Sequence, residues 1–289
     1  DMSVFFSNWL VGTITALVGP GDLVLCDRLN HASLIDGCRL SRARFRVYPH
    51  GDVDFAERDL RRGTETRRKL IVTDSLFSMD GDAAPLRDLC DLAKQQGAML
   101  LVDEAHATGV CGAHGRGLTE ELGIEGRELI KVGTLSKALG SQGGFVAGSR
   151  QLIDWLFNTA RTQMFSTALT PAACAAACAA LEIVAQEPQR RERLRLESTR
   201  LKDRLLAARL NVPSGTIGPI LPIVIGDAAR TVAVGEALQA GGHLVGTIRP
   251  PTVPQRSSRL RISLSAAHRR EDLDALAEQL IALCPAVPA

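Results

Sequence analysis

Short apolar runs recur along the first half of the chain, and segments with helical spacing of apolar residues separate them. Within each run the apolar residues follow one another with little alternation, which is typical of strands that helices cover on both faces. We therefore predict an α/β fold whose central sheet is mostly parallel, with helices on both faces. The runs lie at residues 23–27, 45–48, 70–74, 99–103, 129–133 and 144–148.

Two predicted helices in this region have well-marked ends. The segment 85–97 begins with Pro85, repeats leucine and alanine at helical spacing and ends at Gly97, as expected for a helix between two strands. Thr170 and Pro171 form a suitable N-cap and first-turn pair for the alanine-rich segment that follows them. Both segments therefore predict helices that begin and end close to these residues.

The composition changes near residue 185, where a charged segment follows Pro188. We predict a large domain of residues 1–185 and a small α+β domain of residues 186–289. In the small domain the pattern predicts three helices, one strand and a pair of strands. The helices are at 190–208, 229–240 and 270–283, the strand is at 220–226, and the pair lies around 243–250 and 259–265.

The charge balance narrows the possible partners. Lys and Arg total 34 against 32 for Asp and Glu, a net charge of +2, so we expect no nucleic-acid partner. No apolar run reaches the roughly 18 to 20 residues of a membrane span, and no signal-peptide pattern opens the chain, so we expect no membrane association. The seven cysteines form no C-x-x-C pair and have apolar neighbours, which favours small buried residues of a cytoplasmic protein over disulfides or a zinc site.

Polar side chains follow three of the apolar runs at the point where each run ends. In open α/β sheets, ligands bind at that edge. Pyridoxal phosphate (PLP) suits these groups, because its aldehyde needs a lysine, its ring nitrogen a carboxylate, and its phosphate hydroxyl or N–H donors. Lys137, Asp103 and Thr134 can fill these three roles. The polar residues are Thr73, Asp74, Ser78, Asp103, His106, Thr134 and Lys137.

Each residue also has a simpler interpretation. Asp103 suits a helix cap, Lys137 a solvated lysine, and His31 or His106 a structural histidine, but their joint placement favours a cofactor site. The segment "LLVDEAH" also suits the Mg²⁺ site of a nucleotide-driven helicase, yet the phosphate-binding loop that such an enzyme needs is not found. The glycines of 109–117 match no dinucleotide-binding loop, and we predict no metal site.

Six stretches together resemble the α-oxoamine synthases, PLP enzymes of fold type I, in order over nearly the whole chain. The part "IRPPTVP" resembles the biotin-pathway member of that family most. The resemblance implies a fold type I transferase with a mostly parallel sheet and a small C-terminal domain, PLP as cofactor, and a homodimer. The stretches are "DRLNHASLIDG", "DSLFSMDGDAAPL", "LLVDEAHATGVCGAHGRG", "GTLSKALGSQGG", "FSTALTP" and "IRPPTVPQRSSRLRISLSAAH".

The resemblance assigns catalytic and cofactor-binding roles to five residues of these stretches. It implies that Lys137 forms the Schiff base, that Asp103 faces the pyridine nitrogen, and that His106 donates to the phenolic oxygen of the cofactor. His31 matches a histidine that stacks on the cofactor ring. Ser78 matches a serine that contacts the cofactor.

Further hydroxyls and arginines match the phosphate and substrate sites of the family. Thr134 matches a phosphate ligand, and Ser166 and Thr167 match hydroxyls that reach the phosphate across a dimer interface. Arg261 matches the arginine expected to grip the amino-acid carboxylate, where a planar fork suits two oxygens. Two more candidates lie near the expected substrate channel: Arg249 and Thr252.

The chain departs from the family near its beginning. The family usually has S-G-[FY]-x-A-N, whose N–H groups lie on the phosphate, where this chain has "SNWLVG". Asn8 stands for the glycine and Gly12 for the asparagine, while Trp9 keeps an aromatic ring, and we retain Asn8 and Trp9 as cofactor-binding candidates. "PHGD" at 49–52 replaces the more usual "HND". The chain also opens in mid-pattern without an initiator methionine, so we expect a fragment that lacks an N-terminal segment.

The implied reaction is a PLP-dependent decarboxylative condensation. L-alanine joins a pimeloyl thioester carried by coenzyme A or an acyl carrier protein, and Lys137 is the natural base for the α-proton of alanine. Two alternatives stay open: another α-oxoamine synthase that uses glycine or serine with an acyl-CoA, and a non-catalytic dimerisation or regulatory subunit of the same fold. Retention of Lys137, Asp103, His106 and His31 argues against the second.

Overall fold

The computed structural model describes residues 2–6, 9–63, 65–126 and 128–284. The chain divides into two compact units, which we call the large unit and the small unit. The large unit comprises Asp1–Phe77 and Ala84–Pro188, and the small unit comprises Ser78–Ala83 and Gln189–Ala289. The six residues Ser78–Ala83 therefore belong to the small unit although both their sequence neighbours belong to the large one.

The large unit is built on a seven-stranded sheet in the order β1-β7-β6-β5-β4-β2-β3. From β3 to β6 all neighbouring strands are parallel, whereas β7 is antiparallel to β6 and β1 to β7. The predicted mostly parallel sheet is confirmed. The strands are β1 (Met2–Phe6), β2 (Leu23–Asp27), β3 (Arg44–Tyr48), β4 (Lys69–Asp74), β5 (Met99–Asp103), β6 (Leu129–Thr134) and β7 (Gly144–Gly148).

The two edges of this sheet differ from the sequence prediction. The expectation that helices cover every strand on both faces is wrong for β3, most of whose side chains are exposed, because β3 pairs only with β2 at the edge. Arg44 and Arg46 are exposed on this strand, and charges on an edge disfavour pairing with another chain. At the other edge, β1 forms a strand from Met2 to Phe6, where the sequence indicated only an amphipathic segment.

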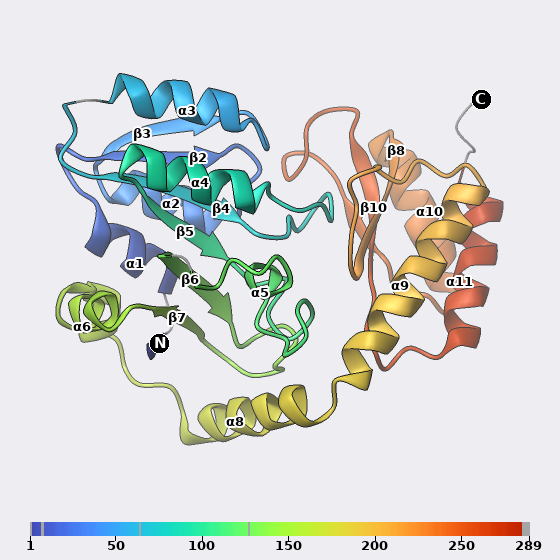
Figure 1. Cartoon of the computed structure of the whole chain (residues 1–289). Helices are drawn as coiled ribbons and strands as arrows, with labels where there is room; N and C mark the ends of the chain where they lie inside the picture. Colours follow the sequence, from blue (N-terminus) through green and yellow to red (C-terminus); the bar gives the residue numbers. More distant parts are fainter. Residues whose placement is uncertain (1, 7–8, 64, 127, 285–289) are drawn as a thin grey trace. The chain divides into compact units, whose positions relative to one another are not determined.

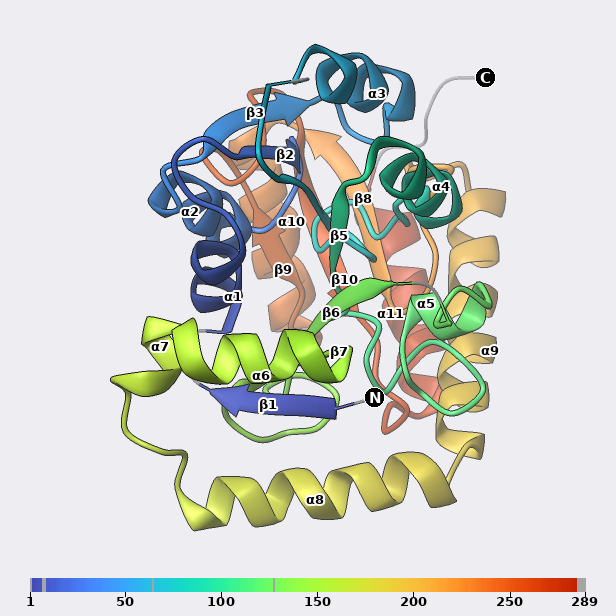
Figure 2. The ribbon, with the colours of Figure 1, turned by 60° about the vertical axis from the view of Figure 1, so that its left-hand side comes forward.

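Helices cover both faces of the large sheet (Figures 1 and 2). On one face, α1 (Trp9–Leu17), α2 (Ala32–Leu40) and α6 (Arg150–Thr159) pack apolar side chains against alternate residues of β2, β4 and β6. On the opposite face lie α3 (Val53–Arg62) and α4 (Leu86–Gln96). The predicted helix at 85–97 is confirmed: Pro85 precedes α4, and Gly97 ends it with a left-handed φ of 59°, a conformation that glycine adopts without strain.

Helix α8 (Pro171–Gln186) is apolar on almost every side and yet mostly exposed. Its predicted start is confirmed, because the Thr170 hydroxyl accepts a hydrogen bond from Ala173 N. Ala177 is its one buried residue and packs against Leu135 and Leu139, whereas most of the other side chains are exposed. Cys174 and Cys178 lie on this exposed part, so the expectation of buried cysteines is wrong for these two. Two short helices, α5 (Leu118–Glu121) and α7 (Arg161–Met164), complete the large unit.

The small unit is an antiparallel sheet in the order β8-β10-β9 with three helices, and its predicted elements are confirmed. Segment Ser78–Ala83 is held there by long-range bonds: the Thr216 hydroxyl donates to Asp80 O over 2.9 Å and Ile217 N donates to Gly81 O over 2.7 Å. The elements are α9 (Gln189–Ala207), β8 (Ile220–Gly226), α10 (Ala228–Ala240), β9 (Gly246–Ile248), β10 (Ser258–Ser263) and α11 (Arg270–Leu283).

None of the helices in the described ranges combines the length and apolarity that crossing a membrane would need.

Candidate active site

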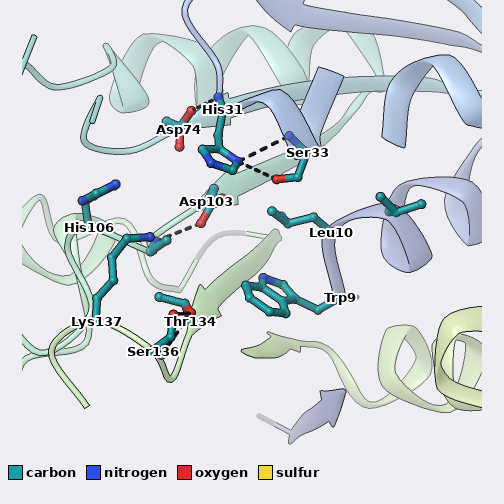
Figure 3. A pocket seen from close by; sticks show the side chains of 12 residues that line it. Trp9, Leu10, His31, Ser33, Asp74, Asp103, His106, Thr134, Ser136 and Lys137 are labelled. Atoms are coloured by element: carbon teal, nitrogen blue, oxygen red, sulfur yellow. Dashed lines mark hydrogen bonds between the residues drawn. The ribbon is translucent and has the colours of Figure 1, made fainter. Parts of the chain in front are cut away.

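One pocket of about 300 Å³ lies in the large unit (Figure 3). It is formed where β4, β5 and β6 end and where α1 and α2 begin, the edge at which parallel sheets bind ligands. The structure brings six predicted residues together here: Lys137, Asp103, His106, His31, Thr134 and Trp9. The complete lining is Trp9, Leu10, Val11, His31, Ser33, Asp74, Asp103, Ala105, His106, Thr134, Ser136 and Lys137.

Two buried carboxylates lie side by side at the floor of the pocket. Asp74 and Asp103 are the last residues of β4 and β5 and face each other in register, and they are 4% and 2% exposed. Burial raises the pKa of Asp103 to about 6, against the opposing effects of the Ala105 N–H and Lys137. Burial and the neighbouring Asp103 raise the pKa of Asp74 well above its usual value. A positive charge placed next to Asp103 would therefore be stabilised by these two carboxylates.

His31 is held over this floor from two sides. Its backbone N donates to Asp74 Oδ2 over 2.7 Å, and its ring Nδ1 accepts from Ser33 N over 3.3 Å as the cap of α2. This second bond fits the tautomer that carries its proton on Nε2. Burial, and then the charge of Lys137, lower the pKa of His31, so the ring is neutral at physiological pH.

A pair of hydroxyls marks the end of β6. Thr134 is 3% exposed, its Oγ1 lies 2.8 Å from Ser136 Oγ, and it accepts from Ser136 N over 3.1 Å. The Thr134 hydroxyl is thus fixed and Ser136 stands beside it at the pocket wall. Two hydroxyls here can bind an anionic oxygen group.

The first turn of α1 closes the pocket opposite these hydroxyls. Trp9 and Leu10 begin the helix and line the pocket, and N–H groups at a helix start favour anions. The Trp9 ring packs so closely on Gly144 that a Cβ atom there would overlap the ring atoms Cδ2, Cε2 and Cε3, so the close approach requires glycine. Asn8, the candidate that precedes Trp9 in the sequence, lies outside the described residues.

Lys137 lies in the loop behind β6, and His106 lies in the loop behind β5. Lys137 is exposed and His106 is half-buried. Figure 3 shows the Lys137 side chain extending past His106 toward the Asp103 carboxylate, and the Lys137 charge lowers the pKa of Asp103 and of His31. A primary amine, a buried carboxylate and a neutral imidazole thus face one cavity, a set that can hold a reactive carbonyl and move a proton.

The remaining predicted residues do not line this pocket. Ser166 and Thr167 lie on an exposed loop between α7 and α8. The other four, Ser78, Arg249, Thr252 and Arg261, belong to the small unit. There Arg261 Nε donates to the carbonyl oxygen of Ser78, and burial lowers the pKa of Arg261. Arg249 and Thr252 form an exposed turn.

Sequence reasoning assigned no role to three polar residues of the pocket wall: Asp74, Ser33 and Ser136. Asp74 was identified as polar at a strand end but received no role, because its importance comes from its register with Asp103. The sequence position of Ser136, two residues after Thr134 and next to Lys137, could have indicated a second hydroxyl at the pocket. For Ser33 there was no indication in the sequence except that it lies two residues after His31.

The segment "PHGD" at 49–52 forms a turn that is bonded to Asp27. Gly51 adopts a left-handed φ of 67°, which glycine and asparagine tolerate best. Its N–H and the ring of His50 both bind Asp27, at 2.9 and 3.0 Å. Glycine at position 51 therefore adopts the conformation that this turn needs without strain.

Comparison with known proteins places this arrangement in a family. The model of the family described as aminotransferase class I and II matches residues 6–280. The chain belongs to the aminotransferase class I and II family. It is 52% identical over 278 residues to 8-amino-7-oxononanoate synthase of Anaeromyxobacter dehalogenans (strain 2CP-C), covering 96% of the chain and 69% of the relative. It is 50% identical over 284 residues to the enzyme of the same name from Aromatoleum aromaticum, covering 97% and 73%.

Solved structures agree with this placement in fold. Serine palmitoyltransferase of Sphingomonas wittichii has a TM-score of 0.93 at 32% identity, covering 99% of this chain and 74% of that one. A variant of serine palmitoyltransferase from S. paucimobilis with a bound PLP–myriocin adduct has a TM-score of 0.93 at 30% identity, covering 98% and 72%. 8-Amino-7-oxononanoate synthase of Francisella tularensis has a TM-score of 0.84 at 27% identity, covering 97% and 81%. The fold type I architecture is confirmed.

Proposed function

We propose that this chain is a PLP-dependent acyltransferase that joins L-alanine to a pimeloyl thioester and forms 8-amino-7-oxononanoate, a step of biotin biosynthesis. The observation that carries the proposal is the convergence of Lys137, Asp103 and His31 on one pocket, in a chain about half identical to synthases of that name. The pocket also fits the cofactor, since it offers an amine, a buried carboxylate, and hydroxyl and N–H donors for a phosphate. A cytoplasmic location is part of the proposal, supported by the free, buried thiols of Cys26 and Cys38.

The pocket residues then have separate roles. Bound PLP supplies an aldehyde for amines and a ring that withdraws electrons. Lys137 would bind the aldehyde of the cofactor and, as a free amine, would act as the base for the α-proton of alanine. Asp103 would hold the proton on the ring nitrogen, and His106 would donate to the phenolic oxygen. His31 would lie against the cofactor ring and present an Nε2–H to the acyl oxygen.

Activity measurements must identify the amino acid and the acyl donor, because related synthases differ in both. The alternative substrates are glycine or serine, and the acyl group can come from coenzyme A or an acyl carrier protein. In the small unit, Arg261 is the proposed partner of the amino-acid carboxylate, and Arg249 and Thr252 are proposed to line the acyl channel. These three assignments rest on the sequence resemblance.

The proposal is tested by incubating the purified protein and PLP with pimeloyl-CoA or pimeloyl-acyl carrier protein and each amino acid. We expect release of CO₂ and 8-amino-7-oxononanoate with alanine, and a rate at least tenfold lower with glycine or serine, as one or two missing or added groups commonly cause. Product mass and released CO₂ are measured. Product from glycine or serine alone would identify another synthase, and PLP binding without any product would favour a non-catalytic subunit.

We also propose that the enzyme is a homodimer whose interface includes α8. Helices that are apolar on all sides are normally buried, yet Leu181 and Ile183 of α8 are 45% and 42% exposed. The loop that carries Ser166 and Thr167 directly precedes this helix and is exposed as well. A second copy that covers α8 would receive these hydroxyls at its phosphate site.

A mixing experiment tests this arrangement. Thr167→Val and Lys137→Ala are each expected to be nearly inactive, but a mixed dimer has one site with both defects and one with neither. Random exchange should therefore restore about a quarter of the wild-type activity. The matched control mixes Lys137→Ala with Asp103→Asn, whose defects lie in one chain's own pocket, and should restore nothing. Equal activity in both mixtures after demonstrated exchange would contradict a phosphate site shared between subunits.

A further inference from the structure

One donor at the pocket has no acceptor within the described residues. The Trp9 ring nitrogen is buried and makes no hydrogen bond, although Trp9 lines the pocket. An indole N–H can only donate, and burying it without an acceptor destabilises the folded protein. The second tryptophan of the chain, Trp155, shows the usual arrangement, since its Nε1 donates to Ala16 O over 2.9 Å.

The position of the Trp9 ring is set by the backbone of the sheet. The ring lies on Gly144, and Gly144 is the register partner of Thr134 on the neighbouring strand. The Cα atoms of paired residues on adjacent antiparallel strands are about 5 Å apart. The indole, which packs on Gly144, is therefore separated from Thr134 by about the spacing between two neighbouring strands. Figure 3 shows the ring at the wall of the pocket with its nitrogen on the edge that faces the cavity.

Resting on the proposed function, we infer that the Trp9 indole N–H donates a hydrogen bond to the phosphate of PLP. It completes a ring of donors with the hydroxyls of Thr134 and Ser136 and the N–H groups of the first turn of α1. A phosphate offers three acceptor oxygens with negative charge, and hydrogen bonds to charged acceptors are about twice as strong as neutral ones.

The test compares two aldehydes that differ only in the phosphate. The cofactor-free wild type, Trp9→Phe and Trp155→Phe are titrated with PLP and with pyridoxal, and the Kd of each is measured by absorbance. We expect Trp9→Phe to weaken PLP binding by tenfold or more and to leave pyridoxal binding unchanged, as the loss of one charge-assisted bond predicts. Trp155→Phe removes an indole N–H that holds the far end of α1, so it controls for loosening of that helix and should leave the ratio of the two Kd values unchanged.

A second measurement does not depend on whether Trp9→Phe folds. In Trp155→Phe, Trp9 is the one remaining tryptophan of the two in the chain, and we expect inorganic phosphate to change its fluorescence in a saturable way that PLP competes away. An unchanged ratio of PLP to pyridoxal affinity in folded Trp9→Phe, or fluorescence that phosphate does not alter, would overturn the inference. Either result leaves the proposed function standing if the wild type still binds PLP at Lys137, whereas a wild type that does not bind PLP overturns both.

Discussion

Asp103→Asn is expected to lower the condensation rate at least a hundredfold while making the cofactor-free protein more stable above pH 7. The loss of activity follows because a neutral amide cannot hold the proton on the ring nitrogen of PLP, and removing one positioned proton-holding group commonly costs a factor of about 10² to 10⁴. The gain in stability follows because Asp103 is a buried carboxylate beside a second one, Asp74. The two effects have opposite signs, so a single variant separates catalysis from folding.

The sign of the stability effect follows from the two pKa values. Asp103 has a pKa of about 6 when folded, raised by burial, against 3.8 as its ordinary value. Between these values the folded protein binds more protons than the unfolded chain, so stability falls as pH rises through this window, and the full cost applies above pH 6. That cost is about 2–3 kcal/mol. Asparagine removes it and keeps an oxygen that can accept from Ala105 N.

Urea unfolding of the cofactor-free wild type and variant between pH 4 and pH 8 measures this effect. The two curves should coincide near pH 4 and separate as pH rises, with the variant more stable. Asp22→Asn is the matched control of opposite sign: burial raises the pKa of Asp22, but hydrogen bonds from Arg67 and Gly19 outweigh it and leave that pKa lowered. Because a lowered pKa places this titration below pH 3.8, this control should be less stable than the wild type by a nearly constant amount from pH 4 to pH 8. Parallel curves for Asp103→Asn and the wild type would contradict the prediction.

Lys137→Ala is expected to reduce activity by at least a thousandfold. The variant loses both the amine that would hold the cofactor aldehyde and the base for the α-proton. Because one substitution removes both functions, we expect a large loss of activity. Borohydride reduction of the wild type with PLP, followed by peptide mapping, should place the pyridoxyl group on Lys137. A small primary amine added to Lys137→Ala should restore part of the proton exchange at the α-carbon of alanine.

Lys131→Ala is the matched control for Lys137→Ala. Lys131 lies on β6 only six residues earlier, but its Nζ binds Glu125 Oε1 over 2.7 Å and it does not line the pocket. Its removal should leave the cofactor spectrum and the rate within a factor of about two, as for most surface changes. A pyridoxyl label on Lys131, Lys69 or Lys94 would show that the lysine was assigned wrongly.

The main residues of the candidate active site could be predicted from the sequence alone, because apolar runs reveal where strands end. Asp103 and Lys137 follow such runs, and the rule that ligands bind at the carboxyl edge brought them together. Asp74 could not be given its role in the same way, since its pairing with Asp103 depends on the register between two strands. The exposed edge of β3 was missed because the pattern of one strand does not reveal its neighbours.

The environment of Trp9 was the least predictable part of the pocket. The sequence offered an aromatic residue near a helix start, but the close contact with Gly144 joins residues 135 positions apart. The inclusion of Ser78–Ala83 in the small unit has the same origin, because the bonds from Thr216 and Ile217 join residues 136 positions apart. Long-range backbone contacts of this kind leave no local periodicity to detect.

The small unit cannot be obtained by cutting the chain once. Arg259 is 6% exposed, and its guanidinium pairs with Asp80 and donates to Met79 O, both from the segment made more than a hundred residues earlier on the ribosome. A contiguous piece that begins at Gln189 would bury that charge with neither partner, a loss that typically destabilises a protein strongly. The unit is therefore a discontinuous domain, whose native form needs a segment from the first half of the chain as well as its own contiguous sequence.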